Sequence, residues 1–395
     1  MTLRDGRALR VLHVVPCFVA LDSEAAGGVA NVVHQLAVRQ AALGIDVTVY
    51  CGTTELGRVV ATTGVRVANS LLRSRAFAQY ATSALGPIRE IRKALVGAGA
   101  AFDVAHVHTC FSLFTETAMD RLANEHVPFV FAPHGKLSPG MRANKGALKT
   151  LWWRLLARRS VARSARIVAL ANAERDAVLT TGLEVPVDII PNGFDRPSSR
   201  SSRTPPFSAP YILFLGYLDP RKQPKLLVEA FAASRSRNSH KLVFVGPDKY
   251  GHGSELLNLA KHLGVADRIL LQGPAYGTEK WTFLENAACL CLPSRGEGLP
   301  VVLCEALGAG VPTIYSEHCN FPEIALAGAG LQVKNFDLRE WANAIDRVTA
   351  DDLFRNRLAR SALALSDKYT WNAVVARTVE TYRAVLGKHT SLVDI

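Results

Sequence analysis

Residues 288–316, which read ACLCLPSRGEGLPVVLCEALGAGVPTIYS, decide the fold. They begin with a short apolar run of strand length, residues 288–292. The loop that follows contains two glycines, and Pro300 then suits a first helical turn because its missing N–H would be unpaired there. The pattern therefore predicts a strand, a glycine-containing loop and a helix in direct succession.

Two further glycines, Gly308 and Gly310, are expected to end this helix, and residues 311–315 predict the next strand. The stretch is then a β-loop-α-β unit whose loop lies at the carboxyl end of a strand. Parallel sheets bind ligands at that edge, where the free N–H groups of the helix start point at the ligand.

Two carboxylates indicate the kind of ligand. Glu297 lies in the loop, and Glu305 lies in the helix among the apolar residues 301–307. A charge in such a run costs free energy unless hydrogen bonds are donated to it, and sugar hydroxyls would donate them. The alternative is a glutamate that caps its own helix or pairs with a distant arginine, and the spacing alone leaves both interpretations open.

Length and composition favour a globular α/β protein of two domains. The chain has 395 residues, of which 49% are hydrophobic and 20% charged. These values exclude a disordered protein, and no uncharged run approaches the roughly 18–20 residues that span a bilayer. The N-terminal sequence lacks a small-residue cleavage pattern, so we expect no signal peptide. The seven cysteines are odd in number, contain no CxxC pair and lie mostly in apolar runs, which predicts reduced thiols in a cytoplasmic protein.

The net charge of +12 has three competing interpretations: nucleic acid, an anionic membrane surface, or phosphorylated substrates. Nucleic acid is the weakest, because the chain has no aromatic-basic interleaving and no known reader motif. Residues 145–163 are basic and partly amphipathic, so they could lie on an anionic membrane surface, as a peripheral protein on the inner face of the cytoplasmic membrane would. A buried helix with an arginine-covered outer face is the equal alternative.

Strands alternate with helical patterns in two series. The expected strands are residues 11–16, 47–51, 103–108, 128–132 and 167–170, then 211–215, 241–245, 269–272 and 288–292. Between the series lies the Ser/Pro/Arg-rich sequence RPSSRSSRTPPFSAP, which has nothing to bury. We therefore expect two Rossmann-like domains, residues 1–196 and 210–370, joined by a linker at 197–209 and followed by a C-terminal helix and tail at 371–395. A cleft between the two domains is where ligands would bind.

Other candidate site residues follow predicted strands. Gly27 and Gly28 open a helix and could cradle phosphate, or form a plain tight turn, and no dinucleotide fingerprint accompanies them. Gly216 is followed by Arg221 and Lys222, two adjacent cations that suit a diphosphate leaving group, although a solvated surface pair is the ordinary alternative.

Histidines follow or lie in two strands of the first series. His106 and His108 are expected to point to the same side of their strand, and His134 ends the next strand. A metal ion would need further ligands, and the chain has no Asp-x-Asp pair to hold one on a diphosphate. His134 is better interpreted as a polar contact to substrate.

Taken together, these residues resemble the retaining glycosyltransferases of family four, group 1 type, and the resemblance covers almost the whole chain. Its most specific part is the family's Glu-seven-Glu signature, matched at Ser294, Glu297, Gly298, Pro300, Glu305, Ala306, Gly310 and Pro312. The phosphate motif matches at Gly216, Leu218 and Lys222 and departs from the family at Tyr217 and Gln223. Further landmarks are Gly27-Gly28, the His-x-His strand, Pro133-His134-Gly135, Ile190 to Gly193, and Tyr369 to Trp371.

The resemblance implies a GT-B fold, two Rossmann-like domains with an interdomain cleft and a C-terminal helix that crosses back to the first domain. It also implies a metal-independent hexosyltransferase that needs no cofactor beyond a nucleotide-sugar donor. Glu305 would hold the ribose hydroxyls, and Glu297 those of the sugar. Lys222, Arg221 and Gly27-Gly28 would contact the diphosphate, and the backbone N–H groups of Gly298 and Leu299 would assist in holding the donor. His134 would contact the sugar near its anomeric carbon. The nucleobase would lie near Gly246 and the stretch from Gly273 to Tyr276.

The expected acceptor is a saccharide or a lipid-linked molecule in cell-surface polysaccharide or glycolipid biosynthesis. Two other functions stay open at this point: a nucleotide-sugar epimerase of the same fold, and a nucleotide-sugar-binding protein without catalysis. Tyr217, where the family has arginine, is the one feature that favours the last.

Overall fold

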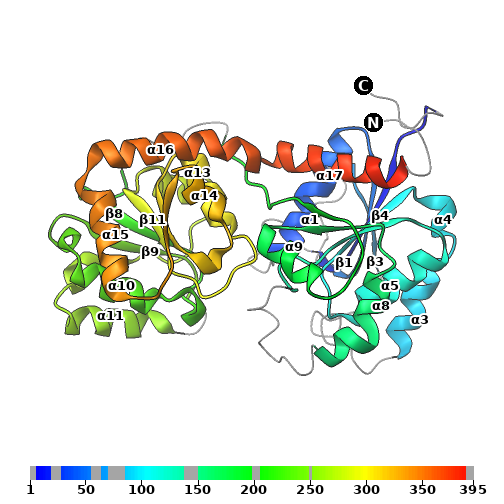
Figure 1. The fold of residues 1–395 in the computed structure, drawn as a ribbon, viewed down its shortest axis with the longest axis horizontal. Coiled ribbons are helices and arrows are strands. Elements are labelled where there is room, and N and C mark those ends of the chain that lie inside the picture. Colours follow the sequence, from blue (N-terminus) through cyan, green and yellow to red (C-terminus); the bar gives the residue numbers. More distant parts are fainter. Residues whose placement is uncertain are drawn as a thin grey trace. The chain divides into compact units, whose positions relative to one another are not determined.

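The computed structural model describes residues 6–18, 28–54, 64–69, 85–137, 150–197, 205–248 and 251–387. The chain divides into two compact units. The N-terminal unit comprises Met1–Pro191 and Trp371–Ile395, and the C-terminal unit comprises Asn192–Thr370. Figure 1 shows both, and each is described below by itself.

The N-terminal unit contains a seven-stranded parallel sheet in the order β3-β2-β1-β4-β5-β6-β7. Its strands are β1 (Arg10–Phe18), β2 (Asp46–Thr54), β3 (Arg66–Asn69), β4 (Val104–His108), β5 (Phe129–Ala132), β6 (Arg166–Ala169) and β7 (Val187–Ile189). Its helices are α1 (Gly28–Ala42), α3 (Leu85–Ala94), α4 (Ala98–Ala101), α5 (Leu113–Asn124), the π-helical turn η2 (Trp153–Ala157), α8 (Arg158–Val161), α9 (Asn172–Leu179) and α17 (Trp371–Leu386).

Alternation along the strands sends side chains to two separate cores. Val11 and Val15 of β1 pack under α1 and α17, whereas Leu12 and Val14 pack on the opposite face with α3 and α5. Figure 1 shows α17 lying along α1 within this unit. The C-terminal helix therefore belongs to the first unit, as the resemblance implied.

The C-terminal unit contains a six-stranded parallel sheet in the order β10-β9-β8-β11-β12-β13. Its strands are β8 (Tyr211–Leu215), β9 (Lys241–Val245), β10 (Ile269–Leu271), β11 (Cys289–Leu292), β12 (Thr313–Ser316) and β13 (Gly330–Val333). Its α-helices are α10 (Pro224–Ala233), α11 (His252–His262), α12 (Gly277–Glu285), α13 (Val301–Ala309), α14 (Pro322–Leu326), α15 (Leu338–Ala350) and α16 (Asp352–Ser366). Its 3₁₀ turns are η3 (Pro220–Lys222), η4 (Arg235–Asn238), η5 (Ala266–Arg268), η6 (Glu317–Cys319) and η7 (Asp367–Tyr369).

The predicted alternation of strands and helices is confirmed in both units, with the strand reversal of doubly wound sheets at β1/β4 and at β8/β11. The sequence missed the short strands β3, β7 and β13. Each contains a polar residue (Arg66 and Asn69 in β3, Asp188 in β7, Gln332 in β13), so it lacks the continuous apolar run that marks the equally short β10 and β11.

The chain changes units between Pro191 and Asn192, before the boundary expected after residue 196. Phe194 shows why. Its backbone N–H bonds the carbonyl of Tyr369, it forms a bridge with Thr370, and its buried ring packs against Gly308. All three contacts lie inside the C-terminal unit. Residues 198–204 of the expected linker lie outside the described residues.

Buried thiols were expected, and Cys51, Cys110, Cys289, Cys291, Cys304 and Cys319 are free and buried. The side chain of Cys17 lies outside the described residues. Among the helices that the structure describes, none combines the length and the apolarity needed to cross a bilayer.

Candidate functional site

The candidate site of the C-terminal unit lies where the strand order reverses. β8 and β11 are neighbours in the sheet, so the loops at their carboxyl ends start side by side. One loop carries Arg221 and Lys222, and the other carries the glycines around Glu297. Far-apart parts of the sequence thus meet at the edge where open parallel sheets bind ligands.

Glu297 is the centre of this site. Lys222 Nζ lies 2.9 Å from its Oε1, and Ser294 Oγ donates to the same oxygen at 2.9 Å. Arg221 Nη1 lies 3.6 Å from Oε2. The side chains of Lys222 and Glu297 are only 12% and 14% exposed, so the pair is largely shielded from solvent. The sequence placed Glu297 and Lys222 in the site separately, and the structure brings them into contact.

The backbone around Glu297 is held from two sides. The Arg221 guanidinium donates to the carbonyl of Gly296, and Arg295 N–H donates to the Arg221 carbonyl at 2.8 Å. Glu297 N–H donates to the carbonyl of His318 at 3.0 Å, and Asn320 Nδ2 donates to the Glu297 carbonyl at 2.6 Å. His318 and Asn320 lie in and after η6, and sequence analysis did not identify them.

Glu305 has a partner that the sequence did not reveal. Lys280 Nζ of α12 donates to its Oε1 at 2.6 Å, and the Glu305 side chain is 14% exposed. The apolar surroundings of Glu305 led us to expect a donor to its carboxylate, and for Oε1 this donor is Lys280 of the protein itself. The alternative, in which Glu305 pairs with a cation distant in the sequence, is confirmed, but the cation is a lysine and not the expected arginine. No local pattern signals it, because the pair joins two separate helices.

The glycine loop opens α13, whose flanking residue at the N-terminal end is Pro300. Gly310 ends the helix in a left-handed conformation with φ 70°, as expected. The expectation for Gly308 was wrong, because this residue lies within the helix. A Cβ there would come within 2.1 Å of the Phe194 ring, so Gly308 is required for close packing. The Leu299 carbonyl accepts a bond from Asn192 Nδ2 at 3.3 Å.

Three strand ends meet at glycines beside this loop. Gly216 follows β8 and Gly246 follows β9, with φ of 145° and 149°. A Cβ on Gly246 would lie 2.0 Å from the Gly216 carbonyl oxygen, and Gly246 N–H bonds the Gly273 carbonyl at 2.7 Å. Tyr276, exposed, precedes α12 at the same sheet edge. The resemblance placed a nucleobase at this edge, beside Gly246 and the stretch from Gly273 to Tyr276.

In the N-terminal unit, histidines gather on the sheet face under α1 and α17. His13, His106 and His108 are fully or almost fully buried, and the rings of His106 and His108 stack with centroids 4.2 Å apart. The expected common side of His106 and His108 is confirmed. His108 Nδ1 lies 2.9 Å from Nε2 of His134, which takes the left-handed φ of 52° just after β5.

Burial keeps these imidazoles neutral. It lowers the pKa of His13 and of His134 to about 4, and holds the pKa of His106 and His108 well below the usual value. The ring nitrogens of His13, His106 and His108 lie within 4.8 Å of one another, a set that neutral imidazoles could offer to a metal ion. Their stacked rings and mutual hydrogen bonds favour a hydrogen-bonded network instead.

Two buried carboxyl groups hold the loops beside these histidines. Glu174 accepts from the N–H groups of Gly135 and Leu170, and Glu116 accepts from those of Phe111 and Ser112. Burial raises the pKa of each carboxyl group to about 7, against the opposing effect of these bonds. Sequence analysis identified neither residue. Trp152 Nε1 also donates to Glu116 at 3.2 Å, which ties the basic segment to α5.

Gly27 lies outside the described residues, and Gly28 is the first residue of α1. In the basic segment, residues 145–149 also lie outside them. The described part exposes Leu151, Leu155 and Leu156 between arginines, while Trp153 and Ala157 are buried. Its outer face is therefore both apolar and basic, unlike a face covered by arginine alone.

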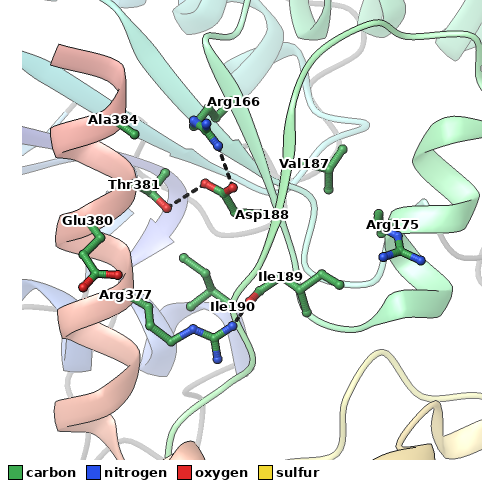
Figure 2. Close-up of a pocket in the computed structure, with 10 residues that line it drawn as sticks. All are labelled: Arg166, Arg175, Val187, Asp188, Ile189, Ile190, Arg377, Glu380, Thr381 and Ala384. Carbon is green, nitrogen blue, oxygen red and sulfur yellow. Dashed lines mark hydrogen bonds and ion pairs between the residues drawn. The ribbon is translucent and has the colours of Figure 1, made fainter. Parts of the chain in front are cut away.

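A groove of about 440 Å³ lies at the free edge of the N-terminal sheet, between β7 and α17 (Figure 2). Arg166 pairs with Asp188 at 2.6 Å, and Thr381 Oγ1 donates to the same carboxylate at 2.8 Å. Arg377 donates to the Ile189 carbonyl. Asp188 and the Ile189 carbonyl in this groove therefore already accept hydrogen bonds from donors within the protein.

Comparison with known families matches both halves of the chain. The family model described as glycosyl transferases group 1 matches residues 195–364, and the model described as glycosyltransferase family 4 matches residues 26–196. Together the two models span most of the 395 residues.

Three relatives share the name D-inositol 3-phosphate glycosyltransferase. A D-inositol 3-phosphate glycosyltransferase of Arthrobacter is 25% identical over 98% of this chain and 97% of its own. One from Stackebrandtia nassauensis is 30% identical over 52% of this chain, and the match spans 48% of that relative. One from Frankia alni is 28% identical over 72% of this chain and 75% of its own.

Solved structures share the fold. A sucrose-phosphate synthase from Thermosynechococcus elongatus is 18% identical with a TM-score of 0.72, covering 96% of this chain and 100% of that one. The Anabaena HepE structure in complex with UDP and glucose is also 18% identical, with a TM-score of 0.70 over 95% of this chain and 100% of that one. The expected two-domain α/β GT-B fold is thereby confirmed. With both halves matched in sequence and the fold shared, the chain belongs to the group 1 glycosyltransferases of family 4.

Proposed function

We propose that the protein is a retaining glycosyltransferase that moves a sugar from a nucleoside diphosphate donor to an acceptor hydroxyl without a metal ion. The observation that carries the proposal is the Lys222–Glu297 contact at the β8/β11 strand reversal, with Arg221 beside it. A diphosphate that enters there meets two cations, and a sugar beside it meets a carboxylate that accepts hydrogen bonds.

Each residue of this edge has a proposed role. Lys222 and Arg221 stabilise the charge that grows on the departing diphosphate, with Gly216 giving the phosphates close access to the backbone. Glu297 accepts hydrogen bonds from the sugar hydroxyls. Glu305, oriented by Lys280, accepts them from the ribose. Gly298 and Leu299 offer backbone N–H groups at the helix start, and the base rests near Gly246 and Tyr276.

The proposed reaction is a displacement on one face of the sugar. The bond between the anomeric carbon and the phosphate oxygen breaks, and a bond between the same carbon and the acceptor oxygen forms. The acceptor's proton passes to the departing phosphate oxygen. His134 of the N-terminal unit and the Gly27-Gly28 pair belong to the proposal as substrate contacts.

The donor class is supported by the neighbouring HepE structures, whose titles record UDP with glucose and UDP-glucose. The relatives named above act, by their names, on an inositol phosphate. For this chain we propose a saccharide or lipid-linked acceptor of cell-surface polysaccharide or glycolipid biosynthesis. An exposed segment that is both apolar and basic, in a chain of net charge +12, supports this proposal.

The first test is a thermal-shift screen of nucleotide sugars, because a ligand that binds the folded state raises apparent stability. Donors that bind are then incubated with sugar and lipid acceptors, with and without a chelator, and the products are followed by NMR. Transfer with the donor's anomeric configuration kept, at a rate the chelator leaves unchanged, supports the proposal. Donor isomerisation without acceptor identifies an epimerase, and binding without turnover identifies a binding protein.

We further propose that the basic segment attaches the protein to an anionic bilayer on the cytoplasmic side. Leu151 is 54% exposed and Leu155 is 67% exposed, and Arg154, Arg158 and Arg159 accompany them. Exposed apolar side chains next to arginines are typical of helices that lie in the interface of anionic membranes.

Vesicle co-sedimentation tests this attachment. We expect binding to vesicles that contain phosphatidylglycerol, a loss of binding in Leu155→Ser, and weak binding to neutral phosphatidylcholine vesicles. Leu353→Ser is the matched control, because Leu353 is 83% exposed but lies in the C-terminal unit. Equal binding by both variants would contradict the assignment to this segment.

A further inference from the structure

Two buried imidazoles, His13 and His108, and the half-buried His134 form one hydrogen-bonded series in the N-terminal unit. Gln40 Oε1 of α1 lies 2.8 Å from His13 Nε2. His13 Nδ1 lies 2.9 Å from His108 Nε2, and His108 Nδ1 lies 2.9 Å from His134 Nε2. The series therefore runs from the buried Gln40 side chain to His134 after β5, and His13 and His108 each use opposite ring nitrogens for their two neighbours.

The series allows only two proton arrangements. Each ring is neutral, so it carries one proton, and each contact between rings needs one donor and one acceptor. The protons therefore lie on Nε2 of all three rings or on Nδ1 of all three. In the first arrangement Nδ1 of His134 is a bare acceptor, and in the second it is a donor.

The end of the series at Gln40 selects between the two. The carboxamide oxygen faces His13, and the amide Nε2 donates to Tyr382 Oη of α17 at 3.3 Å. Tyr382 Oη also lies 2.8 Å from His106 Nδ1, to which it can donate its proton. A carbonyl oxygen can only accept, so His13 must carry its proton on Nε2.

His106 opposes this preference. When Tyr382 donates its hydrogen bond to Nδ1 of His106, the ring proton of His106 lies on Nε2. This buried nitrogen has no hydrogen-bond partner among the described residues. An unpaired buried N–H disfavours the Nε2 arrangement. The preference therefore depends on the contacts at Gln40 and Tyr382, and a change at either is enough to reverse it.

We propose that Gln40 and Tyr382 are positioning residues that fix the proton of His134 on Nε2 and present its Nδ1 as an acceptor to a substrate hydroxyl. The substrate contact rests on the proposed function, whereas the proton arrangement does not. The opposite proton arrangement would place the N–H of His134 Nδ1 against the hydrogen of the substrate hydroxyl, and it would lower the rate of sugar transfer.

Substitutions at Gln40 separate the two arrangements. Gln40→Glu supplies only acceptors, so it keeps the Nε2 arrangement and lets Tyr382 donate to it while His106 donates to Tyr382. Gln40→Met removes the selecting group, and Tyr382→Phe frees the carboxamide to turn. Thr378→Val is the control, because it removes another buried hydroxyl of α17, which donates to the Val374 carbonyl of its own helix.

The experiment is ¹⁵N NMR of histidine-labelled protein, in which protonated and bare ring nitrogens have well-separated shifts, with His134→Asn for assignment. We expect Nε2 protonation of His13, His108 and His134 in the parent protein, Gln40→Glu and Thr378→Val, and a joint change of all three in Gln40→Met. Protonation on Nδ1 in the parent, or a change confined to His13, would overturn the proposal.

Transfer assays on the same variants test the consequence. We expect kcat/KM to fall roughly 10-fold in Gln40→Met and to be retained in Gln40→Glu, as loss of one hydrogen bond predicts. Unchanged transfer in Gln40→Met despite a reversed series would overturn the positioning role. If no donor is turned over by the parent, the proposed function fails while the NMR result still decides the arrangement.

Discussion

Lys222 and Lys225 are three residues apart in the sequence and differ in surroundings. Lys222 contacts Glu297 and is 12% exposed, whereas Lys225 is 58% exposed and pairs with Glu255 on the surface. For Lys222→Met we expect kcat/KM to fall by about 10²-fold or more, because removal of one group that stabilises developing charge has that cost. Lys225→Met should change it less than about 3-fold. Steady-state kinetics with a saturating acceptor measure both, and equal losses would remove Lys222 from the site.

Glu305 allows a second prediction at this scale. Glu305→Gln should raise the donor KM roughly 10-fold, because an amide makes weaker hydrogen bonds to hydroxyls than a carboxylate does. Lys280→Met removes the ion pair but leaves the carboxylate, so it should lower thermal stability more than donor affinity. Donor titrations and melting curves on both variants separate the two effects. A Glu305→Gln protein with unchanged donor affinity would show that this carboxylate serves only the Lys280 pair.

At the scale of elements, the packing of α13 depends on Gly308, which the sequence led us to expect at the end of the helix. A Cβ at Gly308 would meet the Phe194 ring at 2.1 Å, so Gly308→Ala should lower the free energy of unfolding by about 1–3 kcal/mol through overpacking. Phe194→Leu in the same chain makes room for the methyl group, and the double variant should lose less than the sum of the single changes. Urea unfolding of the four proteins measures this coupling, and strict additivity would contradict the contact.

The elements that sequence predicted are those with a long local signal. The periodicity of residues 29–43 and the apolar run before Glu297 each fill a whole helix or strand. β7 and β13 have three and four residues, and their strand conformation is decided by parallel pairing with β6 and β12. Such pairing joins distant residues and leaves no local pattern.

For the whole molecule, buried titratable groups predict how stability depends on pH. The four histidines of the cluster have folded pKa values below the unfolded value, so unfolding takes up protons between about pH 4 and 6.5 and stability rises with pH there. Glu116 and Glu174 have folded pKa values near 7, so unfolding releases their protons and stability falls with pH between about 4.5 and 7. The histidines outnumber the carboxyl groups.

We therefore expect the urea midpoint to rise from pH 4.5 to pH 6.5 and then to level off or decline slightly to pH 7. Circular dichroism at half-unit pH steps measures it. Glu116→Gln removes one opposing group, so its midpoint, although lower throughout, should rise more steeply over the same interval. A midpoint that falls from pH 4.5 to 6.5 would show that the histidine cluster is not neutral in the folded protein.

The sequence by itself determined the two alternating α/β series, the glycine loop with Glu297, and the cations Arg221 and Lys222 after β8, because each is encoded in a few consecutive residues. Only the tertiary structure decided the partners: Lys222 with Glu297, Lys280 with Glu305, and Gln40 and Tyr382 with the histidine series. The reason is that a parallel sheet brings together strand ends and helices far apart in the chain. Charge and hydrogen-bond complementarity then act between residues whose sequence positions carry no trace of their proximity.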